Sequence, residues 1–327
     1  MQEQEEIQTE KPREEIPFQN LYLLSGLVNG NNKVWMYFGT ILLVVLGYIS
    51  FQLISLYPLI QILQEKGYSD LEIASNTSLL FDSTVLGIDM NVILLIELGM
   101  FVFAFFGFMT GLRALHKKTL VSVFTGYESF RWKRFFYAFS IWASLIVLSA
   151  IFSYFSDSNA IKINIHWSGL ILSTLIMLVL MPIQTGLEEV LFRGYLIQGL
   201  SLLFKNGIIP LVLTSLLFAA AHMSNPEVKE YGVGIMFAYY ACFALFMGSI
   251  TLLDEGLELA FGIHFANNFI SSVLITTPNS VIKTYSVFEA QKGDARYEML
   301  VWCIMAGITF GLFWLKYRWK KFNLIVR

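Results

Sequence analysis

The sequence predicts an all-α, polytopic membrane protein with about eight transmembrane helices and a polar site between helices 4, 5 and 7. Three observations lead to this prediction. Hydrophobic residues make up 56% of the 327 residues and charged residues only 14%, whereas soluble domains carry about a quarter charged residues. Eight apolar runs approach the roughly 20 residues that a helix needs to cross the bilayer. Polar side chains cluster at three places, one directly after the fourth run and two within the fifth and seventh.

The chain begins with an acidic segment. Residues 1–17 hold six glutamates and no apolar run, which argues against a cleaved secretory signal peptide and favours a disordered tail. No internal repeat or proline-rich linker divides the rest. We therefore expect an acidic cytoplasmic tail and interfacial segment over 1–33 and a single transmembrane domain over 34–327.

Eight segments are apolar enough to be spans, because in hydrocarbon a helix satisfies all of its own backbone groups. They cover about 34–57, 92–112, 135–155, 166–185, 207–223, 232–253, 257–277 and 298–316. The connections are short except for 58–91. That segment suits a plain connector, with a lid or a partly helical cap as the alternative.

The distribution of lysine and arginine predicts the orientation. With the N-terminus inside, 16 of the 22 basic residues fall on the cytoplasmic side, and six face the other side: Lys66, Lys162, Lys229, Lys283, Lys292 and Arg296. Under the positive-inside rule, both termini are expected in the cytoplasm. We expect a multi-pass protein of a bacterial plasma membrane, in contact with membrane lipid.

Composition also excludes some classes of function. The net charge is −2 and no basic stripe follows a helix, so no nucleic-acid partner is expected. Cys242 and Cys303 both lie in apolar runs and are typical of small core residues rather than of a disulfide framework. The acids Asp254, Glu255 and Glu258 are expected to form a solvated helix start.

The first polar cluster directly follows the fourth span and reads Glu-Glu-Val-Leu-Phe-Arg from residue 188 to 193. Residues four apart share a helix face, so Glu189 is expected to pair with Arg193, while Glu188 points about 100° away. One carboxylate is then neutralised and the other is available. A carboxylate in a poorly hydrated site suits general acid–base catalysis near neutral pH.

Two further clusters lie in the fifth and seventh spans. Phe218 and His222 end the fifth span, and His264 and Asn268 are four apart in the seventh. An imidazole and a carboxamide on one helix face can stabilise an oxyanion in acyl transfer. Ionisable groups within apolar spans are costly and therefore indicate a functional site. A polar network that only ties helices together is the structural alternative.

Taken together, the three clusters resemble the motif set of the CAAX-protease and bacteriocin-processing family of intramembrane proteases, which includes the type II CAAX prenyl endopeptidases. That set is Glu-Glu-x-x-x-Arg, then Phe-x-x-x-His, then His-x-x-x-Asn, in this order on successive membrane segments. The resemblance covers about 166–277. It implies an eight-helix fold and hydrolysis of a peptide bond, in a peptide or protein substrate, within or at the edge of the membrane.

The resemblance also assigns roles to individual residues. Glu188 would activate the attacking water with help from His222. His264 and Asn268 would hold the oxyanion. Glu189 and Arg193 would support the site by pairing, next to Phe218. A glutamate-activated water without a metal or other cofactor is the first expectation, and zinc held by Glu188, His222 and His264, with water in the fourth position, is the second.

This assignment places a demand on the fold. If 207–223 crosses the whole bilayer, His222 ends near the outer face, whereas Glu188 follows the cytoplasmic end of the preceding span. For the two to meet, either 186–205 is a re-entrant or tilted helix, or the predicted span boundaries are displaced.

Two other functions fit parts of the sequence. A non-catalytic immunity or scaffold protein of the same fold would bind a partner and would tolerate substitution of Glu188, His222 and Asn268. A small transporter would use the same groups as a proton relay, but the two halves of the chain show no repeat symmetry. The sequence identifies neither the substrate nor the oligomeric state.

Overall fold

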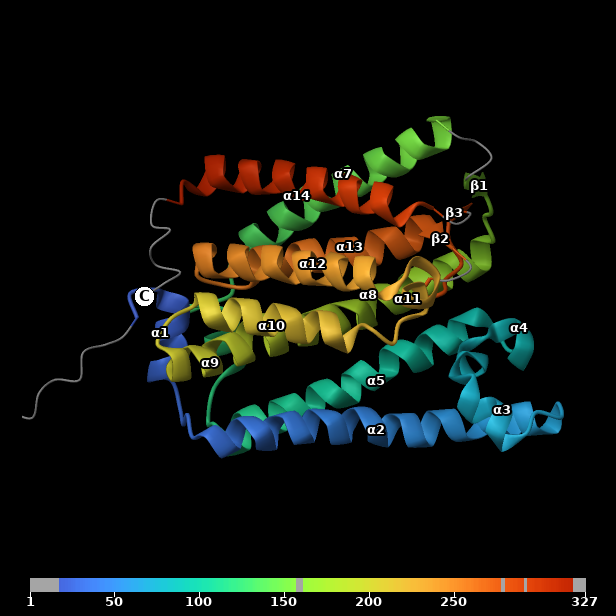
Figure 1. The fold of residues 1–327 in the computed structure, drawn as a ribbon, viewed down its shortest axis with the longest axis horizontal. Helices are drawn as coiled ribbons and strands as arrows, with labels where there is room; N and C mark the ends of the chain where they lie inside the picture. The colour runs from blue at the N-terminus through green and yellow to red at the C-terminus, as the bar shows by residue number, and fades with distance from the viewer. Residues whose placement is uncertain (1–17, 157–160, 278–279, 291–292, 320–327) are drawn as a thin grey trace, which may run out of the picture.

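The structure is a computed structural model that describes residues 18–156, 161–277, 280–290 and 293–319. Its long helices lie roughly side by side, with the short helix α1 at one end of the bundle and three short strands at the other (Figure 1). The predicted acidic tail over 1–17 lies outside the described residues.

The helices and strands follow in chain order. The first half contains α1 (Leu21–Val28), α2 (Val34–Glu65), α3 (Asp70–Ser75), the 3₁₀ helix η1 (Thr77–Phe81), α4 (Ser83–Leu86), α5 (Met90–Thr110), the π-helix η2 (Gly111–Leu115), α6 (Leu120–Phe124), α7 (Trp132–Ser156) and β1 (Ile161–Ile163). The second half contains α8 (Trp167–Glu188), the π-helix η3 (Glu189–Leu196), α9 (Ile197–Phe204), α10 (Ile208–Ala221), α11 (Pro226–Tyr231), α12 (Val233–Asp254), α13 (Glu258–Leu274), β2 (Ile275–Thr276), β3 (Phe288–Ala290) and α14 (Ala295–Tyr317).

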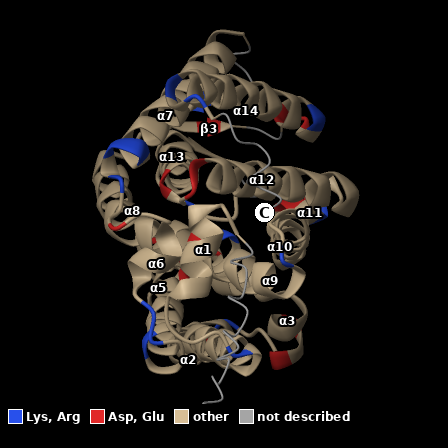
Figure 2. Ribbon diagram, turned by 90° about the vertical axis from the view of Figure 1, so that its left-hand side faces the viewer, with Lys and Arg blue, Asp and Glu red and all other residues tan. Residues whose placement is uncertain are grey.

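All eight predicted spans are helical, and the predicted all-α membrane fold is confirmed. By length and composition, six helices of the described chain can cross a membrane: Val34–Glu65, Met90–Leu115, Trp132–Ser156, Trp167–Phe204, Val233–Asp254 and Ala295–Tyr317. The other two are shorter, since α10 has 14 residues and α13 has 17. Seen from the α1 end, most of the ribbon is neither basic nor acidic, with charged positions at scattered places (Figure 2).

The segment 58–91 is more ordered than a plain connector. Helix α2 continues to Glu65, and α3, η1 and α4 fill most of the remainder. Their buried side chains form a small apolar cluster of Leu59, Leu63, Ile73, Leu80, Leu86 and Ile93. The partly helical alternative is therefore the correct one.

The three strands form one small sheet in the order β1-β3-β2. β1 pairs antiparallel with β3, with Ile161 opposite Ala290, and β2 pairs parallel with β3, with Ile275 opposite Phe288. The sheet thus ties the α7–α8 connection, the end of α13 and the approach to α14 together at the end of the bundle opposite α1 (Figure 1).

At the α1 end, an ion-pair cluster corrects one prediction. Asp254 and Glu258 are 4% and 0% exposed rather than solvated. Arg131 donates to both oxygens of Glu258 and pairs with Asp254, which also bonds Arg134. Glu258 does open a helix, α13, and Asp254 is the last residue of α12. Their partners Arg131 and Arg134 lie at the start of α7, about 125 residues earlier, which local sequence does not reveal.

Candidate active site

Glu188 lies in the middle of one long helix. Helices α8, η3 and α9 run without interruption over Trp167–Phe204, 38 residues in all. The predicted end of the fourth span at 185 was therefore wrong, and 186–204 is a continuation of the span rather than a re-entrant piece. Polar residues interrupt the apolar run in the sequence, but the helix continues because neighbouring helices provide partners for them.

This continuity brings His222 level with Glu188. The chain turns at 205–207 and runs back as α10. At about 1.5 Å per residue, Glu188 lies about 24 Å before the turn and His222 about 22 Å after it. Of the two alternatives, the span boundary is therefore the one that was displaced, and this lets Glu188 and His222 lie at the same depth in the bundle.

Glu189, Arg193 and His264 form the buried part of the site. Arg193 Nη1 donates to Glu189 Oε1 at 3.1 Å, which confirms the predicted pair, and His264 Nδ1 lies 2.7 Å from the same oxygen. The Arg193 guanidinium also lies over the Phe218 ring, 4.0 Å from its centroid. Glu189 is fully buried, and Arg193 and His264 are 2% and 3% exposed.

The contact with Glu189 determines the tautomer of His264. An ionised carboxylate only accepts hydrogen bonds, so Nδ1 carries a proton and donates it to Glu189. In a neutral imidazole, Nε2 is then an acceptor that faces the rest of the site. Glu188 Oε2 lies 3.5 Å from this nitrogen, and Asn268 Nδ2 lies 3.4 Å from it.

Glu188 is held differently from Glu189. Its Oε1 accepts a hydrogen bond from Gln184 Nε2 at 2.7 Å, and its side chain is 14% exposed. Among the residues that the structure describes, Arg193 forms its ion pair with Glu189 alone. Of the two neighbouring carboxylates, Glu189 is therefore neutralised by Arg193 and Glu188 is available, as the spacing predicts.

Asn268 projects from the same face of α13 as His264, one turn further on. Its Nδ2 donates to Gln184 Oε1 at 3.3 Å, and its Oδ1 accepts from Asn267 Nδ2 at 3.2 Å. The Asn267 carboxamide is fixed in turn by Trp142 of α7, whose Nε1 donates to Asn267 Oδ1.

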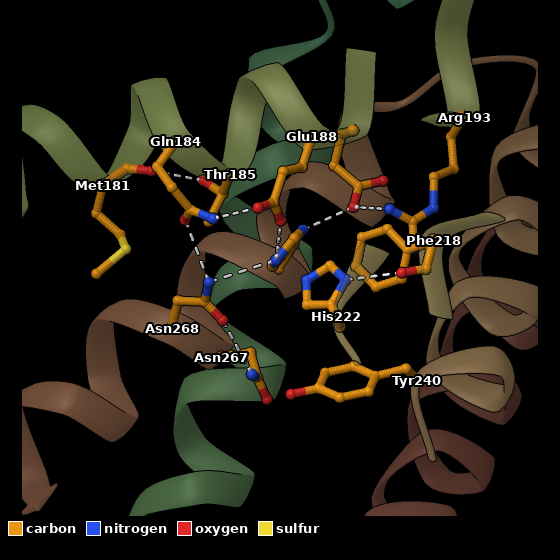
Figure 3. A network of polar contacts seen from close by, with 12 residues as sticks. Met181, Gln184, Thr185, Glu188, Arg193, Phe218, His222, Tyr240, Asn267 and Asn268 are labelled. Carbon is orange, nitrogen blue, oxygen red and sulfur yellow. Dashed lines mark hydrogen bonds and ion pairs between the residues drawn. The ribbon is translucent and has the colours of Figure 1, made fainter. Parts of the chain in front are cut away.

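His222 lies beside these groups, at the C-terminal end of α10. Its Nδ1 lies 2.7 Å from the Phe218 carbonyl oxygen and donates to it. The ring stacks between Phe218 and Tyr240, with centroids 4.2 and 4.6 Å away. Its second nitrogen points toward the side of the site where Glu188 and Asn268 lie (Figure 3). The structure thus gathers every predicted site residue around one place.

A metal fits this arrangement less well. Across the described ranges, no group of three or more His, Cys, Asp or Glu side chains is placed to hold a metal ion. Nδ1 of His264 and Nδ1 of His222 are both occupied, which leaves each imidazole one nitrogen for the site. As placed, Glu188, His222 and His264 do not form a ligand set.

The sequence analysis missed four side chains of the site: Gln184, Asn267, Trp142 and Tyr240. A signal existed for Gln184 and Asn267, because Gln184 precedes Glu188 by one helical turn and Asn267 adjoins Asn268. Trp142 and Tyr240 reach the site from other helices, so no spacing in the sequence predicts their contact.

The fold and site together define a multi-pass α-helical membrane protein with a buried cluster of Glu, Arg, His and Asn at the centre of its bundle. Residues 167–270 match the family model described as type II CAAX prenyl endopeptidase Rce1-like. This part of the chain is therefore similar to a family of membrane endopeptidases, and the matched residues include all three motifs.

One full-length relative was also found. The chain is 27% identical to the uncharacterized protein YyaK of Bacillus subtilis (strain 168) over 292 residues, which cover 86% of this chain and 93% of the relative. No solved structure matches the chain.

Proposed function

We propose that this protein is an intramembrane endopeptidase that hydrolyses a peptide bond of a membrane-associated substrate with water activated by Glu188. The observation that carries the proposal is the difference between two adjacent carboxylates. Glu189 is fully buried and paired with Arg193 and His264, whereas Glu188 is partly exposed and is bound only by neutral or titratable groups. A carboxylate at the edge of a polar site, with no arginine or lysine of the described chain at ion-pair distance, suits a general base.

The proposed reaction uses the surrounding side chains as follows. Glu188 takes a proton from water as the oxygen attacks the substrate carbonyl, and then returns it to the leaving amine. Asn268 Nδ2 donates to the developing oxyanion. Nε2 of His264 can donate there only when it carries a proton of its own, in addition to the one on Nδ1.

His222 completes the proposed site. Because its Nδ1 donates to the Phe218 carbonyl, its Nε2 is free to accept from the attacking water. Glu189 and Arg193 act through His264, by fixing its ring and its tautomer. We propose this reaction without a metal, and zinc held by Glu188, His222 and His264 is the alternative that metal analysis of the purified protein would reveal.

The substrate class follows from the family description. The family description names prenyl endopeptidases acting at CAAX motifs, so a prenylated peptide ending in such a motif is the first substrate to test. The same peptide without the prenyl group belongs beside it, because the polar site itself requires only a peptide bond. We place the protein in a bacterial plasma membrane with both termini in the cytoplasm, since most basic residues lie at the α1 end of the helices.

The decisive experiment replaces Glu188 by glutamine. Loss of a general base lowers the rate by about 10²–10⁴-fold, so Glu188→Gln should lose cleavage of the two peptides while its thermal unfolding in detergent stays close to that of the wild type. Glu255→Gln, at an acid outside the site, is the matched control and should cleave normally.

Full activity in purified Glu188→Gln would end the proposal. A cellular phenotype that survives substitution of Glu188, His222 and Asn268 would instead indicate a non-catalytic immunity or scaffold protein.

A further inference from the structure

Gln184 lies one helical turn before Glu188 and is 5% exposed. Its side-chain amide bonds both Glu188 and Asn268 (Figure 3). None of the three family-like motifs contains it. A buried glutamine in a membrane helix is costly unless its amide groups are bonded, and here both ends of the amide are bonded to site residues.

The chemistry of these partners leaves the amide one orientation. Glu188 only accepts, so the amide nitrogen must face it, at 2.7 Å. The amide oxygen then necessarily faces Asn268 and accepts from its Nδ2, at 3.3 Å. Reversal of the amide would set its oxygen against the carboxylate and its nitrogen against another N–H donor.

A single rigid group therefore determines two positions at once. It holds one oxygen of Glu188, which leaves the other oxygen facing His264 Nε2 at 3.5 Å. It also occupies one N–H of Asn268 and so directs the second toward His264 Nε2, where the oxyanion is proposed to form.

We infer that Gln184 is a positioning residue of the proposed endopeptidase. It holds the general base Glu188, on α8, and the oxyanion donor Asn268, on α13, in a fixed position relative to each other. This inference rests on the proposed function. It assigns Gln184 no contact with the substrate, so its loss should act on the rate of the chemical step and leave binding unchanged.

The first test is Gln184→Met, which keeps the length and packing of the side chain and removes both hydrogen bonds. With the prenylated peptide as probe, kcat should fall about 10- to 100-fold, the range expected when catalytic groups lose their alignment, with little change in KM. The matched control is Gln198→Met. Gln198 is also buried in this long helix and bonds two backbone carbonyls, those of Tyr22 and Ser122, far from the site. That variant should lose stability but keep kcat.

The second test uses Gln184→Glu. The introduced carboxyl group can replace both contacts only when protonated, because its O–H then donates to Glu188 and its C=O accepts from Asn268. The activity of Gln184→Glu relative to wild type should therefore rise as the pH falls, whereas the ratio for Gln184→Met should stay constant. A purely structural role would give two ratios that do not depend on pH.

The outcomes separate the inference from the function. If wild type cleaves and Gln184→Met retains its kcat, or if both ratios are independent of pH, the inference is wrong while the endopeptidase stands. If wild type cleaves neither peptide, the proposed function fails. The contact between Gln184 and Asn268 is then tested by thermal unfolding of Gln184→Met, Asn268→Leu and the double variant. Strictly additive shifts of the unfolding temperature would overturn the positioning role, and non-additive shifts would support it.

Discussion

At the scale of single residues, the most consequential group is the buried Arg193. Its guanidinium is 2% exposed and is bonded to a fully buried carboxylate. A buried ion pair adds little net stability compared with apolar residues of the same volume, but removal of one partner leaves an uncompensated charge. The pair therefore serves to hold His264 in place rather than to stabilise the protein as a whole.

This asymmetry leads to a testable difference between single and double variants. Arg193→Met should lower the free energy of unfolding by about 3–5 kcal/mol, because Glu189 keeps its charge without its cation. Arg193→Met combined with Glu189→Gln should recover much of that loss and still lack activity, since His264 loses its carboxylate. Denaturant titration of the purified protein in detergent measures both. Equal stability of the single and double variants would contradict this account.

Contacts within one helix could be predicted from the sequence, and contacts between helices could not. The pairing of Glu189 with Arg193 follows from a spacing of four. The bond from His264 to Glu189 joins residues 75 apart, and the bond from Trp142 to Asn267 joins residues 125 apart. Only the packing of α7, α8 and α13 against one another determines these contacts.

At the scale of elements, helices α2 and α5 pack with unusually close backbones. A Cβ atom at Gly107 would lie 2.2 Å from the Leu43 carbonyl oxygen, and one at Gly47 would lie 2.4 Å from that of Phe103. Small residues at such positions allow membrane helices to approach closely. The two glycines therefore set the distance between the first two spans.

Gly107→Ala should force these helices apart and destabilise the protein by about 1–3 kcal/mol, the usual cost of overpacking. Gly307→Ala is the control on α14, where an added Cβ would meet nothing within 4 Å. It should be neutral or slightly stabilising, because alanine favours a helix over glycine. Thermal unfolding of both variants in the same detergent makes the comparison, and similar shifts for the two would refute the close-packing account.

The predicted positions of the helices were more accurate than their lengths. Most observed starts and ends lie within a few residues of the predicted ones. The large errors are α2, which continues to Glu65, and the fourth span, which continues to Phe204. In both cases polar residues reduced the local hydropathy. In the fourth span the helix is continuous because other helices provide partners for those residues, whereas in α2 the residues Gln61 and Gln64 are exposed and bond only nearby residues of the chain.

At the scale of the whole molecule, charge is distributed unequally between the two ends. Ten described basic residues lie near the α1 end, namely Lys33, Arg113, Lys117, Lys118, Arg131, Lys133, Arg134, Lys205, Lys316 and Arg318. Five lie near the end with the sheet, namely Lys66, Lys162, Lys229, Lys283 and Arg296. This inequality predicts that the α1 end faces the cytoplasm.

Cysteine labelling in intact cells tests this orientation. With Cys242 and Cys303 first replaced by serine, Lys162→Cys in β1 should react with a membrane-impermeant maleimide, and Lys205→Cys at the end of α9 should react only after the cells are opened. Both positions are exposed. The reverse pattern would place the α1 end outside and would invert the proposed topology.

The arrangement of the bundle as a whole lay beyond the sequence. The small sheet pairs residues near 161, 275 and 288, and the ion-pair cluster joins Arg131 to Glu258. Each is a contact between distant segments with no local pattern. The order of the motifs nevertheless indicated which three spans meet, because costly polar groups in separate spans are stable only where they satisfy one another.

The π-helical segment Glu189–Leu196 makes the helix that follows it sensitive to chain length rather than to composition. A π-turn holds one more residue than an α-turn, so after deletion of one residue this segment can still close as an ordinary α-turn and keep the following helix in phase. An inserted residue would instead rotate everything after it by about 100°. Gln198 and Ser201, now 1% and 0% exposed, would then turn toward lipid although no hydrophobic residue had been replaced. Among related sequences, a one-residue insertion here would matter more than most substitutions in the same helix.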